Sequence, residues 1–280
     1  MKHFLIACAL ALLADAPCCQ AQAIRVTKYG HGTGPAVLFL PGFTAPGAVR
    51  AETVRHLPAH TTSYLVSYAG FRGVQPIDSP WYAAIKGELL RYVQQQKLTH
   101  LTVVGHSMGG NLAVELAVAL PGRVEKLVLV DAIPCMRELM MPGVPATQIR
   151  YQNPYSQQLL ALSADAFRLQ ARQMAQNMVT DPARVDTLVA WSVAADRRTY
   201  VDGYTDLMRL DLRPLLPQVK ARTLILGASL PDTLVIRRTF AQQYAALPTK
   251  TIRLAPASKH FLMLDQPAWF YRQLGAFLAQ

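Results

Sequence analysis

The sequence predicts an α/β protein: a mostly parallel central sheet flanked by helices, with a helical segment inserted late in the sheet. Short, continuously apolar runs recur along the chain, and such runs are typical of strands buried on both faces. Stretches with helical signals separate these runs, and strands that alternate with helices favour a parallel sheet. One interval, residues 133–219, breaks the alternation and predicts the insertion.

The expected strands follow one another in a regular order. Residues 24–29 alternate apolar and polar side chains, as a half-exposed edge strand does. The Ser-Pro pair at 79–80 predicts the start of a helix that extends to about residue 96, and Asp265 predicts the start of a last helix. The continuous apolar runs are residues 36–40, 64–68, 101–104, 126–130, 223–226 and 251–254.

The inserted interval, residues 133–219, is rich in Gln, Ala, Met, Leu and Arg. Residues 157–174 and 181–191 are its clearest helical segments, with Ser163 and Asp181 as start signals. Four apolar residues near its beginning either line an apolar entrance or belong to ordinary packing: Met136, Leu139, Met140 and Met141.

Residues 1–23 differ from the rest of the chain. A charged start, an apolar stretch at residues 4–13 and an Ala-Gln-Ala sequence ending at Ala23 predict a secretory signal peptide cleaved before Ile24. The apolar stretch is too short to span a bilayer as a permanent helix. A lipid anchor on Cys18 is less favoured, because Asp-Ala-Pro precedes it. We therefore expect an exported protein, periplasmic or secreted, that is soluble after cleavage and has no stable membrane insertion.

The composition, with 51% hydrophobic and 16% charged residues among 280, is that of a globular protein. Cleavage leaves Cys135 as the only cysteine, so no intramolecular disulfide can form, and its apolar context indicates a small buried residue. The formal net charge of +11 does not predict a nucleic-acid partner, because Lys and Arg form no run longer than two and no aromatic residues are interleaved with them. The charge instead favours adsorption to anionic envelopes or polymers. No metal-ligand motif or dinucleotide fingerprint is present in the sequence, so no metal or cofactor is expected.

The most informative stretch, residues 105–110, has the sequence Gly-His-Ser-Met-Gly-Gly. A short apolar strand precedes it, and a helix at residues 111–120 follows. Gly105 and Gly109 allow a turn so tight that a Cβ at either position would collide with nearby backbone. Ser107 then projects from the edge of the sheet, where a nucleophile is placed. The alternative is a glycine-rich turn with no chemistry.

On this motif the chain is identified as a member of the α/β-hydrolase superfamily. Its Gly-His-Ser-Met-Gly-Gly resembles the nucleophile elbow residue by residue, and the similarity extends in order over nearly all of residues 24–280. The resemblance implies a core of residues 24–132 and 220–280, with residues 133–219 as a helical cap over the nucleophile. It also implies two antiparallel strands at the start, of which only one fits after Ile24, so a trimmed sheet edge is expected.

The same resemblance implies the chain order serine, acid, histidine. Of the seven histidines, only His260 lies C-terminal to Ser107. Residues 257–267 resemble the loop and helix around the catalytic histidine of the superfamily, although Lys259 stands where glycine is more common. We therefore expect His260 to be the general base, whereas His106 is expected to be structural.

The acid has two candidates. The superfamily usually places it three residues beyond the glycine that corresponds to Gly227, but Leu230 occupies that position and Asp232 follows two residues later. We favour Asp232 over Asp131, which follows the preceding strand, where some members carry the acid. Asp232 can equally be the N-cap of a helix beginning near Thr233.

Two backbone N–H groups are expected to bind the oxyanion of the transition state. The resemblance implies Met108, which follows the nucleophile, and Phe43, because Pro41-Gly42-Phe43 resembles the His-Gly-X loop of the superfamily. Pro41 replaces the histidine that usually braces this loop. A backbone donor does not depend on that side chain, so activity is still expected.

A serine at the elbow predicts acyl transfer, whereas the dehalogenases and epoxide hydrolases of the superfamily carry aspartate there. We expect a carboxylesterase that cleaves small to medium apolar esters through an acyl-enzyme. A cofactor-free perhydrolase or a peptidase would share the triad, and a peptidase would need an acidic cluster, for which Asp202 and Asp206 are candidates. A catalytically silent binding protein is the alternative of a different class, suggested by the displaced acid and the histidine missing before Gly42.

Overall fold

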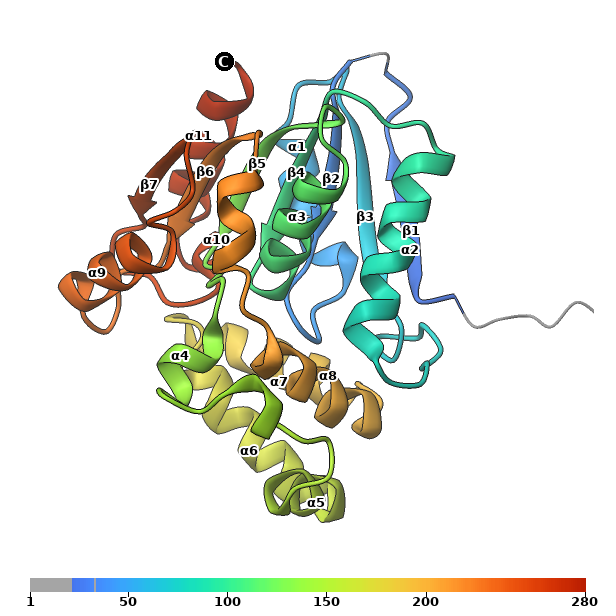
Figure 1. The fold of residues 1–280 in the computed structure, drawn as a ribbon, viewed down its shortest axis with the longest axis vertical. Coiled ribbons are helices and arrows are strands. Elements are labelled where there is room, and N and C mark those ends of the chain that lie inside the picture. The colour runs from blue at the N-terminus through green and yellow to red at the C-terminus, as the bar shows by residue number, and fades with distance from the viewer. Residues whose placement is uncertain (1–21, 33) are drawn as a thin grey trace, which may run out of the picture.

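The computed structural model describes residues 22–32 and 34–280 and shows a central sheet with helices on both faces (Figure 1). Over these residues the sheet has seven strands in the order β1-β3-β2-β4-β5-β6-β7. Strand β1 is antiparallel to β3, and the other neighbours are parallel. The predicted fold class is confirmed, with one antiparallel strand at the edge. The strands are β1 (Ile24–Tyr29), β2 (Ala36–Leu40), β3 (Thr62–Tyr68), β4 (Leu101–His106), β5 (Val124–Val130), β6 (Arg222–Gly227) and β7 (Lys250–Leu254).

Two apolar cores, one on each face of the sheet, join the helices to the strands. The first contains side chains of α2, α3 and α9, and the second contains side chains of α1 and α11. The helices outside the insertion are α1 (Ala51–Arg55), α2 (Trp81–Gln95), α3 (Met108–Ala119), α9 (Thr233–Gln243), α10 (Leu262–Asp265) and α11 (Pro267–Leu278), with a short 3-10 helix at Gly47–Arg50.

Strand β2 illustrates why the strands appear as continuous apolar runs. Leu38 and Leu40 lie in the first core, and Val37 and Phe39 lie in the second. Because successive side chains of a strand point to opposite faces, a strand covered on both faces must be apolar at every position. In the edge strand β1, Ile24 is buried and Val26 is partly buried, whereas the other residues are exposed, in agreement with its mixed sequence.

Between β5 and β6 the chain forms a separate helical layer, which we call the cap, at the bottom of Figure 1. It lies at the edge of the sheet where β5 ends. Its helices are α4 (Met136–Met140), α5 (Pro154–Ala161), α6 (Ala164–Gln176), α7 (Pro182–Val193) and α8 (Arg197–Arg209), with 3-10 helices at Ala146–Gln148 and Arg213–Gln218. The start signals at Ser163 and Asp181 are confirmed, since these side chains accept backbone N–H groups of α6 and α7.

The start of α2 differs from the prediction. Pro80, not Ser79, occupies the N-cap, and the Ser79 hydroxyl donates to Asp202 of α8 at 3.0 Å. The backbone N–H of Tyr82 donates to Asp206 of α8, also at 3.0 Å. Asp206 of the cap thus satisfies an N–H at the N-terminus of a core helix, a task for which negative charge is well suited, and Asp202 binds the residue before the N-cap.

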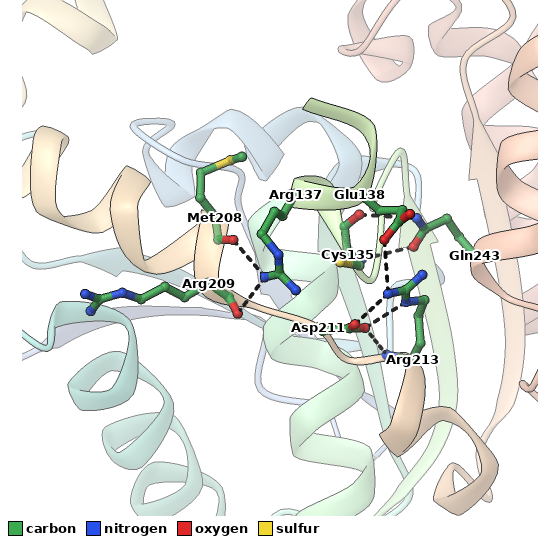
Figure 2. Close-up of polar contacts among 8 residues, drawn as sticks. All are labelled: Cys135, Arg137, Glu138, Met208, Arg209, Asp211, Arg213 and Gln243. Carbon is green, nitrogen blue, oxygen red and sulfur yellow. Dashed lines mark hydrogen bonds and ion pairs between the residues drawn. The ribbon is translucent and has the colours of Figure 1, made fainter. Parts of the chain in front are cut away.

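The two segments that connect the cap to the core are bonded to each other (Figure 2). The Arg137 guanidinium donates to the carbonyl oxygens of Met208 and Arg209, at 3.0 and 3.1 Å. The Gln243 side chain from α9 both donates to and accepts from the backbone of Cys135, at 3.2 and 3.0 Å. Cys135 itself is fully buried, as expected. These bonds hold the junction of the cap against the core.

The predicted signal peptide falls almost wholly on residues 1–21, which lie outside the described residues. Within residues 22–32 and 34–280, no helix combines the length and the apolar character needed to cross a bilayer.

Candidate active site

Ser107 occupies the sharp corner between β4 and α3. Its backbone has φ 53° and ψ −123°, a region that side chains other than glycine seldom adopt. A Cβ on Gly105 would clash with the carbonyl oxygen of Gly109, and a Cβ on Gly109 would clash with the carbonyl oxygen of Leu40. The expectation that both glycines are required by backbone contact agrees with this geometry. The Ser107 N–H donates to the Val130 carbonyl oxygen at 2.9 Å, which ties the strained corner to the end of β5.

His260 lies in the loop after β7 and contacts Asp131. Its Nδ1 is 2.7 Å from Asp131 Oδ2, and the other carboxylate oxygen, Oδ1, accepts the Ala228 N–H at 2.8 Å. Because a carboxylate accepts hydrogen bonds, the neutral imidazole in this contact carries its proton on Nδ1, and Nε2 is then the acceptor. This arrangement suits a histidine that removes a proton from a hydroxyl group.

The preference for Asp232 as the partner of His260 is wrong. Asp232 is exposed and is the N-cap of α9, where its carboxylate accepts the N–H groups of Leu234 and Val235 at 2.8 and 3.0 Å. The N-cap role, which the sequence also allowed, prevails because these amides lie within two or three residues of the carboxylate. Instead, Asp131, which follows β5, contacts His260, which follows β7.

His106 lies beneath His260 and is buried. Its Nε2 is 3.1 Å from the His260 carbonyl oxygen, which can only accept, so Nε2 carries the donated proton. Burial lowers the pKa of His106 well below its usual value, and nearby His260 and Arg50 lower it further. A neutral His106 therefore supports the backbone of the loop that carries His260, in agreement with the structural role expected from the sequence.

The cap and a nearby carboxylate also hold the His260 loop. The Phe261 N–H donates to the Met178 carbonyl oxygen of the cap at 2.9 Å. Asp265 accepts the N–H groups of Lys259 and Thr180, both at 2.8 Å. The sequence suggested Asp265 only as a helix start, whereas the structure uses it to join the histidine loop to the cap. No local pattern in the sequence shows this contact, because Thr180 is remote along the chain.

The two predicted oxyanion donors lie on either side of the serine. Met108 is the first residue of α3, so its N–H belongs to an unpaired helix N-terminus. On the other side, a Cβ built on Gly42 would lie 3.4 Å from Ser107 Cβ, so the loop that carries Phe43 passes directly beside the serine. The Tyr68 hydroxyl donates to the Pro41 carbonyl oxygen at 3.2 Å and braces this loop where a histidine is missing.

Ser107, His260 and Phe43 all line one cavity of about 430 Å³ between the core and the cap. The cap contributes mainly apolar and aromatic side chains to it. Met136 and Met140 belong to the lining, whereas Leu139 and Met141 do not. The remaining lining residues are Gly42, Thr44, His106, Met174, Ala175, Asn177, Met178, Leu188, Trp191, Ser192, Tyr200, Tyr204, Leu207 and Phe261.

The acidic pair considered for a peptidase does not face this cavity. Asp202 and Asp206 are buried against the N-terminus of α2, and Asp206 also accepts the Tyr151 hydroxyl at 2.5 Å. Neither carboxylate belongs to the cavity lining. Across the described part of the chain, no cluster of His, Cys, Asp and Glu has the arrangement of a metal site.

A mostly parallel sheet, a serine at the strand-to-helix corner, and a histidine on the same cavity that contacts a carboxylate are the features of an α/β hydrolase. The alpha/beta hydrolase family matches residues 37–273, and the chain belongs to that family.

Among curated proteins, the chain is similar to enzymes named pimeloyl-[acyl-carrier protein] methyl ester esterase. The protein of that name from Shewanella sp. strain MR-7 is 25% identical over 256 residues, which cover 89% of this chain and 93% of the relative. The one from Vibrio vulnificus strain YJ016 is 27% identical over 257 residues, covering 88% and 95%.

Solved structures of esterases and related proteins share the fold. An esterase from Exiguobacterium antarcticum aligns with a TM-score of 0.75 at 20% identity, covering 93% of this chain and 98% of that one. A bromoperoxidase from Bacillus anthracis aligns with a TM-score of 0.74 at 21% identity, covering 92% and 95%. At these identities the likeness concerns the fold, which hosts several chemistries.

Proposed function

We propose that the protein is an exported serine hydrolase, a carboxylesterase that cleaves apolar esters through an acyl-enzyme. The observation that carries the proposal is the placement of Ser107, on its strained corner, and His260, held by Asp131, on one apolar cavity. The curated relatives support ester chemistry, since their names describe a methyl ester esterase.

In the proposed reaction Ser107 Oγ attacks the ester carbonyl carbon while His260 Nε2 takes the hydroxyl proton. Asp131 keeps the imidazole oriented and stabilises its positive charge, and the N–H groups of Met108 and Phe43 bind the oxyanion. The tetrahedral intermediate collapses, the bond to the alcohol oxygen breaks, and His260 gives its proton to the leaving alcohol. Water then attacks the acyl-enzyme by the same steps, which releases the acid and restores Ser107.

The geometry favours this function over the alternatives. A peptidase loses its supporting feature, because Asp202 and Asp206 bind the start of α2 and do not face the cavity. A silent binding protein was suggested by a displaced acid and a missing histidine. Asp131 supplies a carboxylate to His260, and Tyr68 braces the loop of Phe43. Both observations that suggested a protein without catalytic activity therefore have another explanation. A perhydrolase would use the same groups with peroxide in place of water.

Labelling with a fluorophosphonate probe tests the proposal, because only an activated serine reacts fast with it. We expect the mature wild type to be labelled and Ser107→Ala and His260→Ala to lose the label. Ser192 lines the same cavity, so Ser192→Ala is the matched control and should remain labelled. A wild-type protein that stays unlabelled and inactive on p-nitrophenyl acetate would contradict the proposal.

Export requires its own test, because it is inferred from residues 1–23 alone. Expression of the full chain in a Gram-negative host should yield a shortened protein in the periplasm or medium. A full-length protein in the cytoplasm would contradict export without affecting the proposed chemistry.

A further inference from the structure

Four methionines of the cap line the cavity: Met136, Met140, Met174 and Met178, which we call the methionine group. Met136 and Met140 lie one turn apart on α4, and therefore on one face of that helix. Met174 lies in the last turn of α6, and Met178 follows the end of that helix.

The methionine group is less buried than the other described methionines of the core, although Met136 and Met178 also pack against the apolar cores. Met108, Met208 and Met263 have 2%, 6% and 4% of their surface exposed and belong to the apolar interior. In contrast, no member of the methionine group is buried, and Met140 is 61% exposed. Met136, Met174 and Met178 are partly exposed.

The backbone that carries the group is held by hydrogen bonds, and among the side chains Met174 Sδ accepts the Tyr200 hydroxyl at 3.6 Å. Arg137 on α4 donates to two carbonyl oxygens of the returning segment, as Figure 2 shows, at 3.0 and 3.1 Å. The Met178 carbonyl oxygen accepts the Phe261 N–H at 2.9 Å. An unbranched thioether side chain has three rotatable bonds and fills irregular spaces at little cost. The methionine group can therefore change shape without movement of the cap.

Charge limits what this cavity can hold. Among the described residues that line it there is no Asp, Glu, Lys or Arg. The polar groups around it belong to the catalytic residues and to a few neutral side chains, such as Asn177 and Ser192. An ionised group placed against the methionine group would lose its hydration without gaining a partner, which is strongly unfavourable.

We propose that the cavity takes esters whose longer arm is an uncharged aliphatic chain, and that the methionine group lets it accept chains of different length. The inference rests on the proposed function, since the chain must be presented to Ser107. It adds the substrate class and names the residues that set it. Stiff β-branched side chains in the same places would hold one shape and accept a narrower range of chains.

The chain-length test compares kcat/KM for p-nitrophenyl acetate, butyrate, hexanoate and octanoate. For the wild type we expect values from butyrate to octanoate to lie within about tenfold of one another. In Met140→Ile and in the double variant Met136→Ile with Met174→Ile, the ratio of kcat/KM for octanoate to that for acetate should fall by about tenfold. Met140 is exposed, so the single variant tests the inference even if the double variant does not fold.

Met141→Ile is the matched control, because Met141 adjoins Met140 but does not line the cavity. It should leave the ratio unchanged. An unchanged ratio in Met140→Ile and in the double variant, or an equal fall in Met141→Ile, would overturn the role of the methionine group. Normal acetate hydrolysis in the same experiment would leave the proposed function intact.

The charge test uses binding, so that it does not depend on turnover. Calorimetry on Ser107→Ala should detect methyl hexanoate and methyl octanoate, whereas monomethyl adipate should bind at least about tenfold more weakly. Equal binding of the adipate would overturn the uncharged substrate class. If the wild type is not labelled by the fluorophosphonate but Ser107→Ala binds methyl octanoate, the result would contradict the proposed function and leave the substrate class intact.

Discussion

The corner at Ser107 and the methionine group face the same cavity but are built in opposite ways. At the corner, neighbouring backbone lies so close to Gly105 and Gly109 that no Cβ fits, and Ser107 is held in a strained conformation. In the methionine group, the side chains are partly or largely exposed, and an unbranched thioether has three rotatable bonds. The comparison teaches that the proposed chemistry depends on closely packed backbone, whereas the proposed selection of the substrate depends on adaptable side chains.

The largest expected effect concerns the two aspartates. Asp131→Asn should lower kcat/KM on p-nitrophenyl acetate by about 10⁴-fold, because an amide holds His260 in the wrong tautomer. Asp232→Asn should leave kcat/KM within about twofold, since asparagine also caps helices well. Steady-state kinetics on both purified variants decides this. A loss of activity confined to Asp232→Asn would show that the observed contact of His260 is not the working one.

The rigidity of the corner is tested by Gly109→Ala. The new Cβ would lie 2.6 Å from the Pro41 carbonyl oxygen as well as against Leu40, so we expect a loss of about 3 kcal/mol or more in the free energy of unfolding. Gly143, in the cap, is the control: its φ is 77° but nothing lies within 4 Å of a Cβ. Gly143→Ala should cost about 1 kcal/mol. Urea unfolding of both variants measures the difference, and equal losses would contradict it.

The buried histidine of the corner makes stability depend on pH. Because the pKa of His106 is lowered in the folded state, the unfolded state binds its proton more readily. Stability from this residue is therefore complete above the unfolded pKa of about 6.5 and is lost as the pH falls below it, by at most about 1.4 kcal/mol per pH unit.

His106→Asn isolates this contribution. Urea unfolding is measured at about pH 7.5 and about pH 5.5, roughly one unit on either side of that pKa. On acidification, the free energy of unfolding should fall less for the variant than for the wild type. Equal losses in the two proteins would show that His106 does not carry the pH dependence. The same variant should lower kcat/KM by about tenfold, because support for the His260 carbonyl is weakened.

The smallest expected effect is at the N-terminus, far from the cavity. Ala23 is buried, its N–H donates to Glu88 at 2.9 Å, and its carbonyl oxygen accepts the Ala69 N–H at 2.9 Å. A chain that starts at Ile24 loses both bonds and should be about 1–2 kcal/mol less stable than one that starts at Gln22. Thermal unfolding of the two chains measures this, and kcat/KM should be equal in both.

Local sequence was sufficient where the determinants are local. The doubly covered strands appear as apolar runs, and the serine corner appears as two glycines around Ser107, although the backbone that Gly109 approaches belongs to the distant Leu40. His260 could be selected because it is the only histidine after Ser107. Cys135 could be assigned to the interior from its apolar neighbours, and it is buried.

Local sequence did not predict the hydrogen-bond partner of a side chain where two partners were compatible with the sequence. Asp232 matched the expected spacing only roughly and also matched an N-cap, and the nearby amides of α9 hold it. Asp202 and Asp206 were candidates for a substrate amine, but they bind the start of α2, which lies more than a hundred residues earlier. Such choices depend on which distant groups come within hydrogen-bond distance.

The amino-acid sequence by itself determined the order of strands and helices, the position of the serine corner and the choice of His260, because periodicity, a short motif and chain order can be read from the chain without its fold. Only the tertiary structure decided that Asp131 meets His260, that Asp265 links the histidine loop to the cap, and that Met136 and Met140 join Met174 and Met178 around one cavity. These pairings join segments far apart in the chain, and their free energy comes from contacts that exist only once the sheet and the cap have assembled.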